Sequence, residues 1–380
     1  MKEYIQQLKP TLDTVFEYLH KHPEISWNEY KTTEYIAHFL QERGFIIQTF
    51  DDCPGLIVET GTGDACVALR TDMDALWQEV DGQFQAVHSC GHDAHMTMLL
   101  GTMLLLQKMN LPSKGKLKFI FQPAEEKGAG ALKMIEKHVL DGVDFLYGVH
   151  LRPIQELNDG EAVPAIYHGA AKFMGGEIIG EDAHGARPHL GQNAIEIGAS
   201  LVHEIKNIHL NPMVPHTAKL TRFQAGSESG NIIPGKASFS IDLRAQTNEV
   251  MSELTEKIEA ITEYLAKLNG VTITLETKAD IAAAKIDPEA QRFMEQAIIE
   301  TLGEKKLQNP IITSGGEDFH FYTLKNPHVK ATMLGLGCDL QPGLHHPNMS
   351  FNREALYPGI EILARTVLNT LTKYEKGKGS

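Results

Sequence analysis

The side chains best suited to chemistry in this chain are a cysteine, several histidines and several acids, grouped in short stretches. Residues 88–95 read His-Ser-Cys-Gly-His-Asp-Ala-His. Cys90 and His92 are two residues apart, which suits a turn leading into a helix better than one helix face. Thiolate, imidazole and carboxylate together suit Zn²⁺ and are also usable by Co²⁺, Ni²⁺ or Mn²⁺. The stretch alone leaves two alternatives open, a metal site or a buried thiol beside surface imidazoles.

Further acidic and imidazole side chains directly follow segments that we predict to be strands. They are Asp72 and Asp74 after residues 66–70, Glu125 and Glu126 after residues 116–121, and His150 after residues 143–149. Taken singly, two nearby aspartates can cap a loop, and adjacent glutamates are usually a solvated helix start. In an open α/β sheet, however, ligands gather at the carboxyl ends of the strands. The shared placement therefore favours one site at that edge of the sheet.

The elements that would position these residues alternate between helix and strand. Helices are predicted at residues 12–19, 31–43, 95–109 and 129–138, and strands at residues 46–50, 55–59, 66–70, 116–121 and 143–149. The same style resumes near the C-terminus, at residues 288–302, 330–336 and 353–371. This alternation predicts an open mixed α/β sheet with helices on its faces.

The middle of the chain has a different pattern. Strands are predicted at residues 172–179, 218–224, 236–244 and 271–276, and helices at residues 193–210 and 248–268. Within residues 236–244, apolar and polar side chains alternate, as in a strand with one buried face. The order βαββαβ is that of a ferredoxin-like α+β sandwich. We therefore predict a catalytic domain of residues 1–171 and 285–380, interrupted by an inserted domain at residues 172–284.

Composition argues against several classes of function. The chain has 380 residues, of which 42% are hydrophobic, and a net charge of −14. It has no basic run, so we expect no nucleic-acid partner. The apolar run at residues 96–106 is too short to cross a bilayer, and the N-terminal residues lack an apolar signal segment, so we expect no membrane partner. The four cysteines form no C-x-x-C pair and indicate no disulfide framework, which fits a cytoplasmic protein.

With these residues assembled, the chain resembles the aminoacylase/carboxypeptidase family of dinuclear metallohydrolases, in its amidohydrolase branch. This branch includes hippurate hydrolases and auxin-conjugate hydrolases. The matching motifs run in the family's order along nearly the whole chain. They are Leu19–Glu24, Arg70–Leu76, Cys90–His95, Phe121–Glu126, Gly148–His150, Ala183-His184 with Pro188-His189, Gly230–Pro234, Gly315–Phe319 and Leu344–Pro347.

The resemblance implies the residues of a metal site. It makes five residues ligands of two divalent metal ions, Zn²⁺ or Mn²⁺, with Co²⁺ or Ni²⁺ as alternatives. These ligands are Cys90, which would bridge the two ions, His92, Glu126, His150 and His345. Glu125 matches the general base, which takes a proton from the metal-activated water that attacks an amide carbonyl. Asp74 matches an acid that the family keeps beside the metals.

Other matched positions concern the substrate. His184 matches a histidine that stabilises the oxyanion from the inserted domain, often that of a partner subunit. Asn231 and Arg244 match positions near the carboxylate of the substrate, which suits an arginine fork. Gly316 belongs to a further motif assigned to substrate binding. Because the family pairs through its inserted domain, the resemblance implies a lid and dimerisation role for residues 172–284. Some members of the family are monomeric, so a homodimer and a monomer both stay open.

The resemblance predicts a metal-dependent amidohydrolase that acts on small N-acyl or N-aryl-acyl amino acids, and the cysteine usage predicts a cytoplasmic one. Two alternatives stay open, a dipeptidase or carboxypeptidase-type hydrolase and a non-catalytic relative that binds a ligand. One departure from the family pattern bears on the choice. Trp77-Gln78-Glu79 directly follows Leu76, so the loop is one residue shorter than usual and lacks its proline. That loop borders the substrate pocket in the family, which leaves substrate size open.

Overall fold

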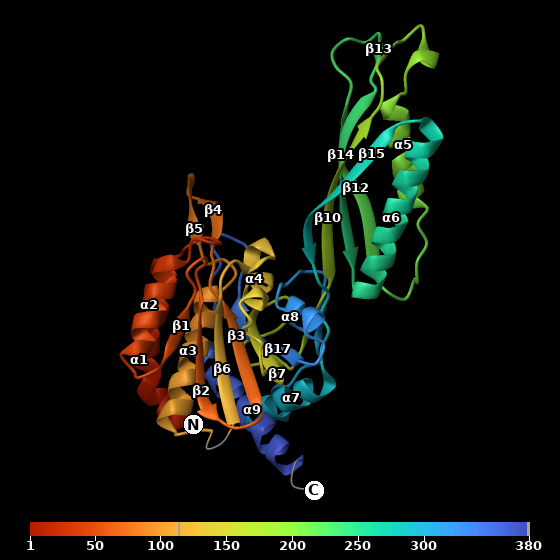
Figure 1. The fold of residues 1–380 in the computed structure, drawn as a ribbon. Helices are drawn as coiled ribbons and strands as arrows, with labels where there is room; N and C mark the ends of the chain where they lie inside the picture. The colour runs from red at the N-terminus through yellow and green to blue at the C-terminus, as the bar shows by residue number, and fades with distance from the viewer. Residues whose placement is uncertain (113–114, 378–380) are drawn as a thin grey trace. The chain divides into compact units, whose positions relative to one another are not determined.

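The computed structural model describes residues 1–112 and 115–377 (Figure 1). Contacts divide the chain into two compact units. The first contains Met1–Tyr167, Lys285–Ile311 and Asp318–Ser380, and the second contains His168–Ala284 and Ile312–Glu317. The second unit thus begins at His168, where the sequence places the boundary at residue 172, and it also takes a short segment from further along the chain.

The first unit is built on a seven-stranded sheet. In spatial order its strands are β1 (Ile47–Thr49), β2 (Leu56–Thr62), β6 (Gly115–Gln122), β3 (Cys66–Asp72), β7 (Phe145–Pro153), β17 (Lys330–Leu340) and β8 (Ala162–Val163). The four central strands, from β6 to β17, are parallel, and the outer pairs are antiparallel. Every residue of β3 and β7 is buried, as expected for parallel strands covered on both faces. The predicted mixed sheet is confirmed.

Helices cover this sheet. They are α1 (Lys2–Lys21), α2 (Tyr30–Gln41), α3 (His92–Lys108), α4 (Gly130–Glu136), α7 (Pro288–Leu302), α8 (His320–Lys325) and α9 (Leu356–Gly377). Helix α3 is buried at every position from His92 to Leu106 and packs against α1, α9 and β3. A helix that is apolar on all sides belongs in the centre of a core. It therefore provides a rigid support for the residues at its N-terminus.

The remaining short elements of the first unit connect its layers. β4 (Leu76–Val80) and β5 (Gln83–Val87) form a hairpin that projects from the unit (Figure 1). The sequence did not predict this hairpin, because its side chains are largely exposed and carry no clean apolar alternation. β9 (Ile166–His168) and β16 (Ile311–Thr313) mark segments where the chain passes from one unit to the other. Short 3₁₀ turns lie at Glu125–Lys127, Glu304–Lys306 and Arg353–Ala355.

The second unit has the predicted ferredoxin-like order. It runs β10 (Ala170–Ile179), α5 (Ala194–Lys206), β12 (His216–Ala225), β14 (Lys236–Ala245), α6 (Asn248–Asn269) and β15 (Thr272–Ile281). The antiparallel sheet order is β12-β14-β10-β15. The alternating apolar residues of β14 are buried and pack with α5 and α6 in a separate core. A small pair, β11 (Ala183–His184) and β13 (Ile232–Ile233), and a 3₁₀ turn at Pro188–Leu190 complete the unit.

Among the described residues, every helix is too short or too polar to span a bilayer.

Candidate metal centre

Backbone turns at the carboxyl edge of the sheet present the predicted ligands. β3 ends at Asp72, and β6 ends at Gln122 just before the turn that carries Glu125 and Glu126. Gly91 is the N-cap of α3 and has a φ of 83°, so a turn separates Cys90 from the start of the helix at His92, as the spacing predicted. His150 lies within β7 rather than at its end, opposite Gly335 of β17.

The predicted ligands form two groups that share one thiol. Cys90, His92 and His150 each place a ligand atom within 4.8 Å of the other two, and so do Cys90, Glu126 and His345. The Cys90 sulfur lies 3.6 Å from His150 Nε2, and Glu126 Oε1 lies 3.4 Å from His345 Nε2. Ligands about 2.0–2.3 Å from one tetrahedral cation are roughly 3.3–4 Å apart. The five side chains thus have the spacing of two adjacent cation sites that share Cys90.

Unpaired polar atoms test whether a cation fits this cluster. Both ring nitrogens of His92 and Oε1 of Glu126 are buried without a hydrogen-bond partner. Buried polar groups are rarely left in that state, because each costs about 1–3 kcal/mol. His92 Nδ1 faces the Asp74 carboxylate at an ion-pair distance of 3.4 Å without a hydrogen bond, and His150 Nδ1 is 2.6 Å from the Leu151 carbonyl. Outer partners of this kind orient ligating histidines, so the residues fit a divalent cation.

Proton affinities show where negative charge is concentrated. Burial disfavours charge on His92, but Asp72 and Cys90 raise its pKa well above the ordinary value. The neighbouring Cys90 and Glu126 side chains raise the pKa of His345 to about 10. Burial raises the pKa of the Cys90 thiol, and Glu126 adds to this effect. The cluster stabilises positive charge, and a bound divalent cation would displace these protons.

Asp74 holds the turn that carries both glutamates. Its Oδ1 accepts the Glu125 N–H at 3.1 Å, and its Oδ2 accepts the Glu126 N–H at 3.0 Å and the Ser26 hydroxyl at 2.6 Å. The Asp318 N–H donates to Glu125 Oε1 at 3.4 Å. Glu125 therefore borders the cluster, with Oε2 4.0 Å from His92 Nε2, while its backbone is fixed from behind.

A buried ionic network behind the centre was not foreseen from the sequence. Arg70 donates to Asp72 Oδ2 at 2.7 Å, to Gln122 Oε1 at 2.8 Å and to Asp318 Oδ1 at 2.8 Å. Asp72 Oδ1 is 2.8 Å from His95 Nδ1, and His95 Nε2 accepts the N–H of the residue after His150. Both ring nitrogens of His95 therefore have protein partners, and His95 packs behind the predicted ligands. The only sequence signal was that Arg70 and Asp72 share a strand end.

The predicted substrate residues all belong to the second unit. His184 lies on β11 with its side chain exposed, and its Nδ1 accepts the Ala186 N–H at 3.0 Å. Arg244 lies on β14 and donates to both carboxylate oxygens of Asp242, at 2.8 and 3.0 Å. Asn231 precedes β13, and Gly316 packs near Ile281. Their roles toward a substrate stay predictions.

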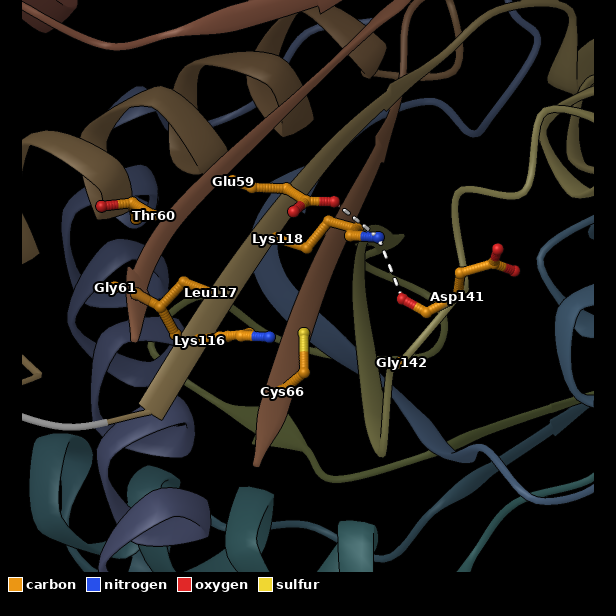
Figure 2. A pocket seen from close by; sticks show the side chains of 9 residues that line it. All are labelled: Glu59, Thr60, Gly61, Cys66, Lys116, Leu117, Lys118, Asp141 and Gly142. Carbon is orange, nitrogen blue, oxygen red and sulfur yellow. Dashed lines mark hydrogen bonds and ion pairs between the residues drawn. The ribbon is translucent and has the colours of Figure 1, made fainter. Parts of the chain in front are cut away.

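A separate cavity of about 170 Å³ lies at the opposite, amino end of β3 and β6 (Figure 2). Cys66, Lys116 and Lys118 line it. The nearly buried Lys118 ammonium is satisfied by Glu59 at 2.8 Å and the Asp141 carbonyl at 3.2 Å. Burial raises the pKa of the Cys66 thiol to about 11, so it is a poor nucleophile. This cavity has no part in the metal centre.

Comparison with known proteins gives a consistent result. A protein-family model described as peptidase family M20/M25/M40 matches residues 68–369. A Synechocystis protein described as a hydrolase is 31% identical, with 96% of each chain covered. An N-acetyl-L-cysteine deacetylase of Bacillus subtilis is 29% identical, covering 98% of this chain and 91% of that one. A solved structure from Bacillus subtilis, a dinuclear metal-binding peptidase of the M20 family, is 25% identical with a TM-score of 0.80, covering 95% and 98%.

Proposed function

The chain belongs to peptidase family M20/M25/M40 and is a hydrolase, and from that premise we propose that it cuts the amide bond of small N-acyl amino acids. One observation carries the proposal. Two groups of ligands share Cys90, and a further carboxylate, Glu125, borders them. This is the arrangement that metal-assisted amide hydrolysis needs. We assign two divalent cations to it, Zn²⁺ or Mn²⁺, held by Cys90, His92, Glu126, His150 and His345.

Two adjacent divalent cations would polarise the amide carbonyl and lower the pKa of water at the site. The remaining chemistry belongs to the side chains. Glu125 takes a proton from the attacking water, whose oxygen bonds to the carbonyl carbon. As the carbon–nitrogen bond breaks, Glu125 gives that proton to the leaving amine. The products are a carboxylic acid and a free amino acid, and the base is restored.

Asp74 and Asp318 keep Glu125 in position for both transfers. Asp74 binds the backbone of Glu125 and Glu126, so the two carboxylates cannot exchange places. The Asp318 N–H donates to one oxygen of Glu125, and the other oxygen, which lies 4.0 Å from His92 Nε2, carries the proton. We assign separate roles to the adjacent glutamates, because Glu126 Oε1 faces His345 Nε2 at 3.4 Å, whereas Glu125 Oε2 lies 4.0 Å from His92 Nε2.

Only the residue-by-residue resemblance supports the roles that we propose for residues of the second unit. We assign His184 to the developing oxyanion, and Asn231, Arg244 and Gly316 to the far end of the substrate. We also propose a homodimer through this unit, which size-exclusion chromatography with light scattering would test. A reducing compartment such as the cytoplasm suits the proposal, because Cys90 must stay a free thiol to bind cations.

The test is hydrolysis of a panel of N-acetyl and N-aroyl amino acids beside dipeptides, with metal analysis of the same protein. We expect turnover of N-acyl amino acids, lost with a chelator and regained with Zn²⁺ or Mn²⁺. The peptidase description of the family favours the second candidate, a dipeptidase or carboxypeptidase-type enzyme, which would cut only the dipeptides. Metal-loaded protein that turns over neither class would contradict both and favour a ligand-binding role.

A further inference from the structure

Gln78, on the hairpin strand β4, joins the two chain segments that carry Cys90 and His345. We propose that Gln78 is a positioning residue that sets how firmly the cation shared by Cys90, Glu126 and His345 is held. The inference rests on the two-cation centre of the proposed function. Gln78 is not one of the predicted ligands, and it acts through the backbone of His345.

Three hydrogen bonds make this connection. The Gln78 amide donates from Nε2 to the His345 carbonyl at 2.7 Å, and its Oε1 accepts the Ser89 hydroxyl at 2.7 Å. The His345 N–H in turn donates to the Ser89 carbonyl at 2.7 Å. Because a backbone carbonyl can only accept, the amide must turn its NH₂ group toward His345. These three hydrogen bonds therefore form a closed ring that links the hairpin, Ser89 and His345.

His345 is the ligand that most needs such support. Its side chain is 54% exposed, whereas those of His92 and Glu126 are 1% and 9% exposed. Its backbone has a φ of 64°, a left-handed conformation that costs a non-glycine residue about 1–2 kcal/mol. The protein core thus holds most of the cluster, while His345 keeps its strained conformation through polar contacts at its backbone. Gln78 satisfies its carbonyl and Ser89 its N–H.

The hairpin also supplies a matched control. Gln78 is paired with Gln85 across β4 and β5, so the same side chain occurs at the opposing position. Gln85 is exposed, and its side chain makes no hydrogen bond to any of the described residues. Removing the amide of Gln85 changes the hairpin without touching the His345 segment.

Calorimetric titration of the chelator-treated, full-length protein with Mn²⁺, checked by elemental analysis after gel filtration, tests the inference. In Gln78→Ala and Gln78→Glu we expect one of two binding steps to weaken about 10–100-fold, the usual effect of losing an outer partner of a ligand. The other step should keep its wild-type affinity, and Gln85→Ala should keep both. Gln78→Glu is the sharper variant, since it can still accept from Ser89 but cannot donate to His345.

The outcomes separate this inference from the proposed function. Wild-type protein that binds two Mn²⁺ ions, with both steps unchanged in the Gln78 variants, overturns the role of Gln78 alone. Wild-type protein that binds no Mn²⁺, Zn²⁺, Co²⁺ or Ni²⁺ overturns the proposed function and this role with it. Equal weakening in the Gln85 variant would also count against Gln78, because the effect would then belong to the hairpin as a whole.

Discussion

Glu125 and Glu126 are neighbours in sequence, yet their surroundings give them different chemistry. Glu126 Oε1 faces His345 at 3.4 Å and His92 at 3.9 Å, so it lies among ligands. Glu125 receives the Asp318 N–H on one oxygen and borders the cluster with the other. A carboxylate committed to a cation is a poor base, whereas one beside it can take a proton.

Replacing Glu125 by Gln should therefore remove turnover and leave cation binding intact. The amide keeps the size of the side chain but cannot accept a proton, so we expect kcat to fall about 10²–10⁴-fold. Steady-state kinetics and Mn²⁺ titration on one preparation measure both. A variant that keeps full activity would rule out Glu125 as the base, and loss of a cation would make it a ligand.

Arg70 should be worth more to stability than any surface arginine. Its side chain and those of Asp72 and Asp318 are at most 1% exposed, so Arg70→Met leaves two buried carboxylates without their cation. We expect a loss of about 3–5 kcal/mol in the free energy of unfolding, measured by urea denaturation. In Arg353→Met, which breaks a half-exposed pair with Glu17, the loss should be much smaller, because solvent screens the pair. Equal losses of stability in the two variants would contradict a stabilising role for the buried Arg70 network.

Glu29 should make stability depend on pH. It is fully buried, accepts the Ala124 N–H at 2.8 Å, and has its pKa raised from 4.5 to about 8 by burial and by Asp74. Between these values the folded protein holds a proton that the unfolded chain has released, so the free energy of unfolding falls as pH rises through that window. In chelator-treated Glu29→Gln, the free energy of unfolding should no longer show this decrease with pH. Urea unfolding from about pH 5 to about pH 9 measures it. An unchanged slope would mean that Glu29 titrates normally.

At the scale of elements, the turn after β6 is the part on which the chemistry depends. Ala124 has a φ of 52°, and the chain then passes through Glu125 and Glu126 before reaching Gly130 at the start of α4. A Cβ on Gly130 would lie 1.7 Å from the Pro123 carbonyl oxygen. Only glycine allows α4 to approach this turn so closely.

Gly130→Ala should thus displace the turn and lower kcat/KM by about 10²-fold, the effect of misplacing a catalytic group by about 1 Å. Gly101→Ala is a useful comparison, because its Cβ would meet the Ile360 side chain in the core, 2.4 Å away, and not the turn. That variant should lose thermal stability and keep its turnover per folded molecule. Wild-type kinetics in Gly130→Ala would show that the turn tolerates the shift.

Local patterns predicted most elements and failed where structure depends on partners. Apolar periodicity located α3, β6 and the strands of the second unit, because each buries a face of its own. It ended β7 at residue 149, whereas pairing with β17 continues the strand through His150 to Pro153. Arg70 was missed for a similar reason. Two of its three partners lie 52 and 248 residues away, and no spacing within a short segment predicts such contacts.

At the scale of the whole molecule, the five predicted ligands come from four distant stretches and lie together in the first unit. Motif order could predict that set, because short turns fix each ligand locally. The order of the seven strands in the sheet could not be predicted from the sequence, because the residues of a strand do not indicate which other strands it pairs with. The roles of His184, Asn231 and Arg244 stay predictions, because they concern a substrate and not a contact within one unit.

Cations that join such distant stretches should stabilise the whole fold. A cation at about 100 times its Kd adds about 2.7 kcal/mol per site to the free energy of unfolding. We therefore expect Mn²⁺ to raise the Tm of the wild-type protein by several degrees in calorimetry. Cys90→Ala should lose most of this gain, because both groups share that thiol, whereas Cys53→Ala, at a buried free cysteine elsewhere, should keep it. Equal gains in both variants would contradict a shared thiol.

Anomalous diffraction from crystals grown with Mn²⁺ tests the central claim most directly. Two anomalous peaks are expected, both beside the Cys90 sulfur, one next to His92 and His150 and the other next to Glu126 and His345. No peak at these residues, or a single ion lying away from Cys90, would contradict the account.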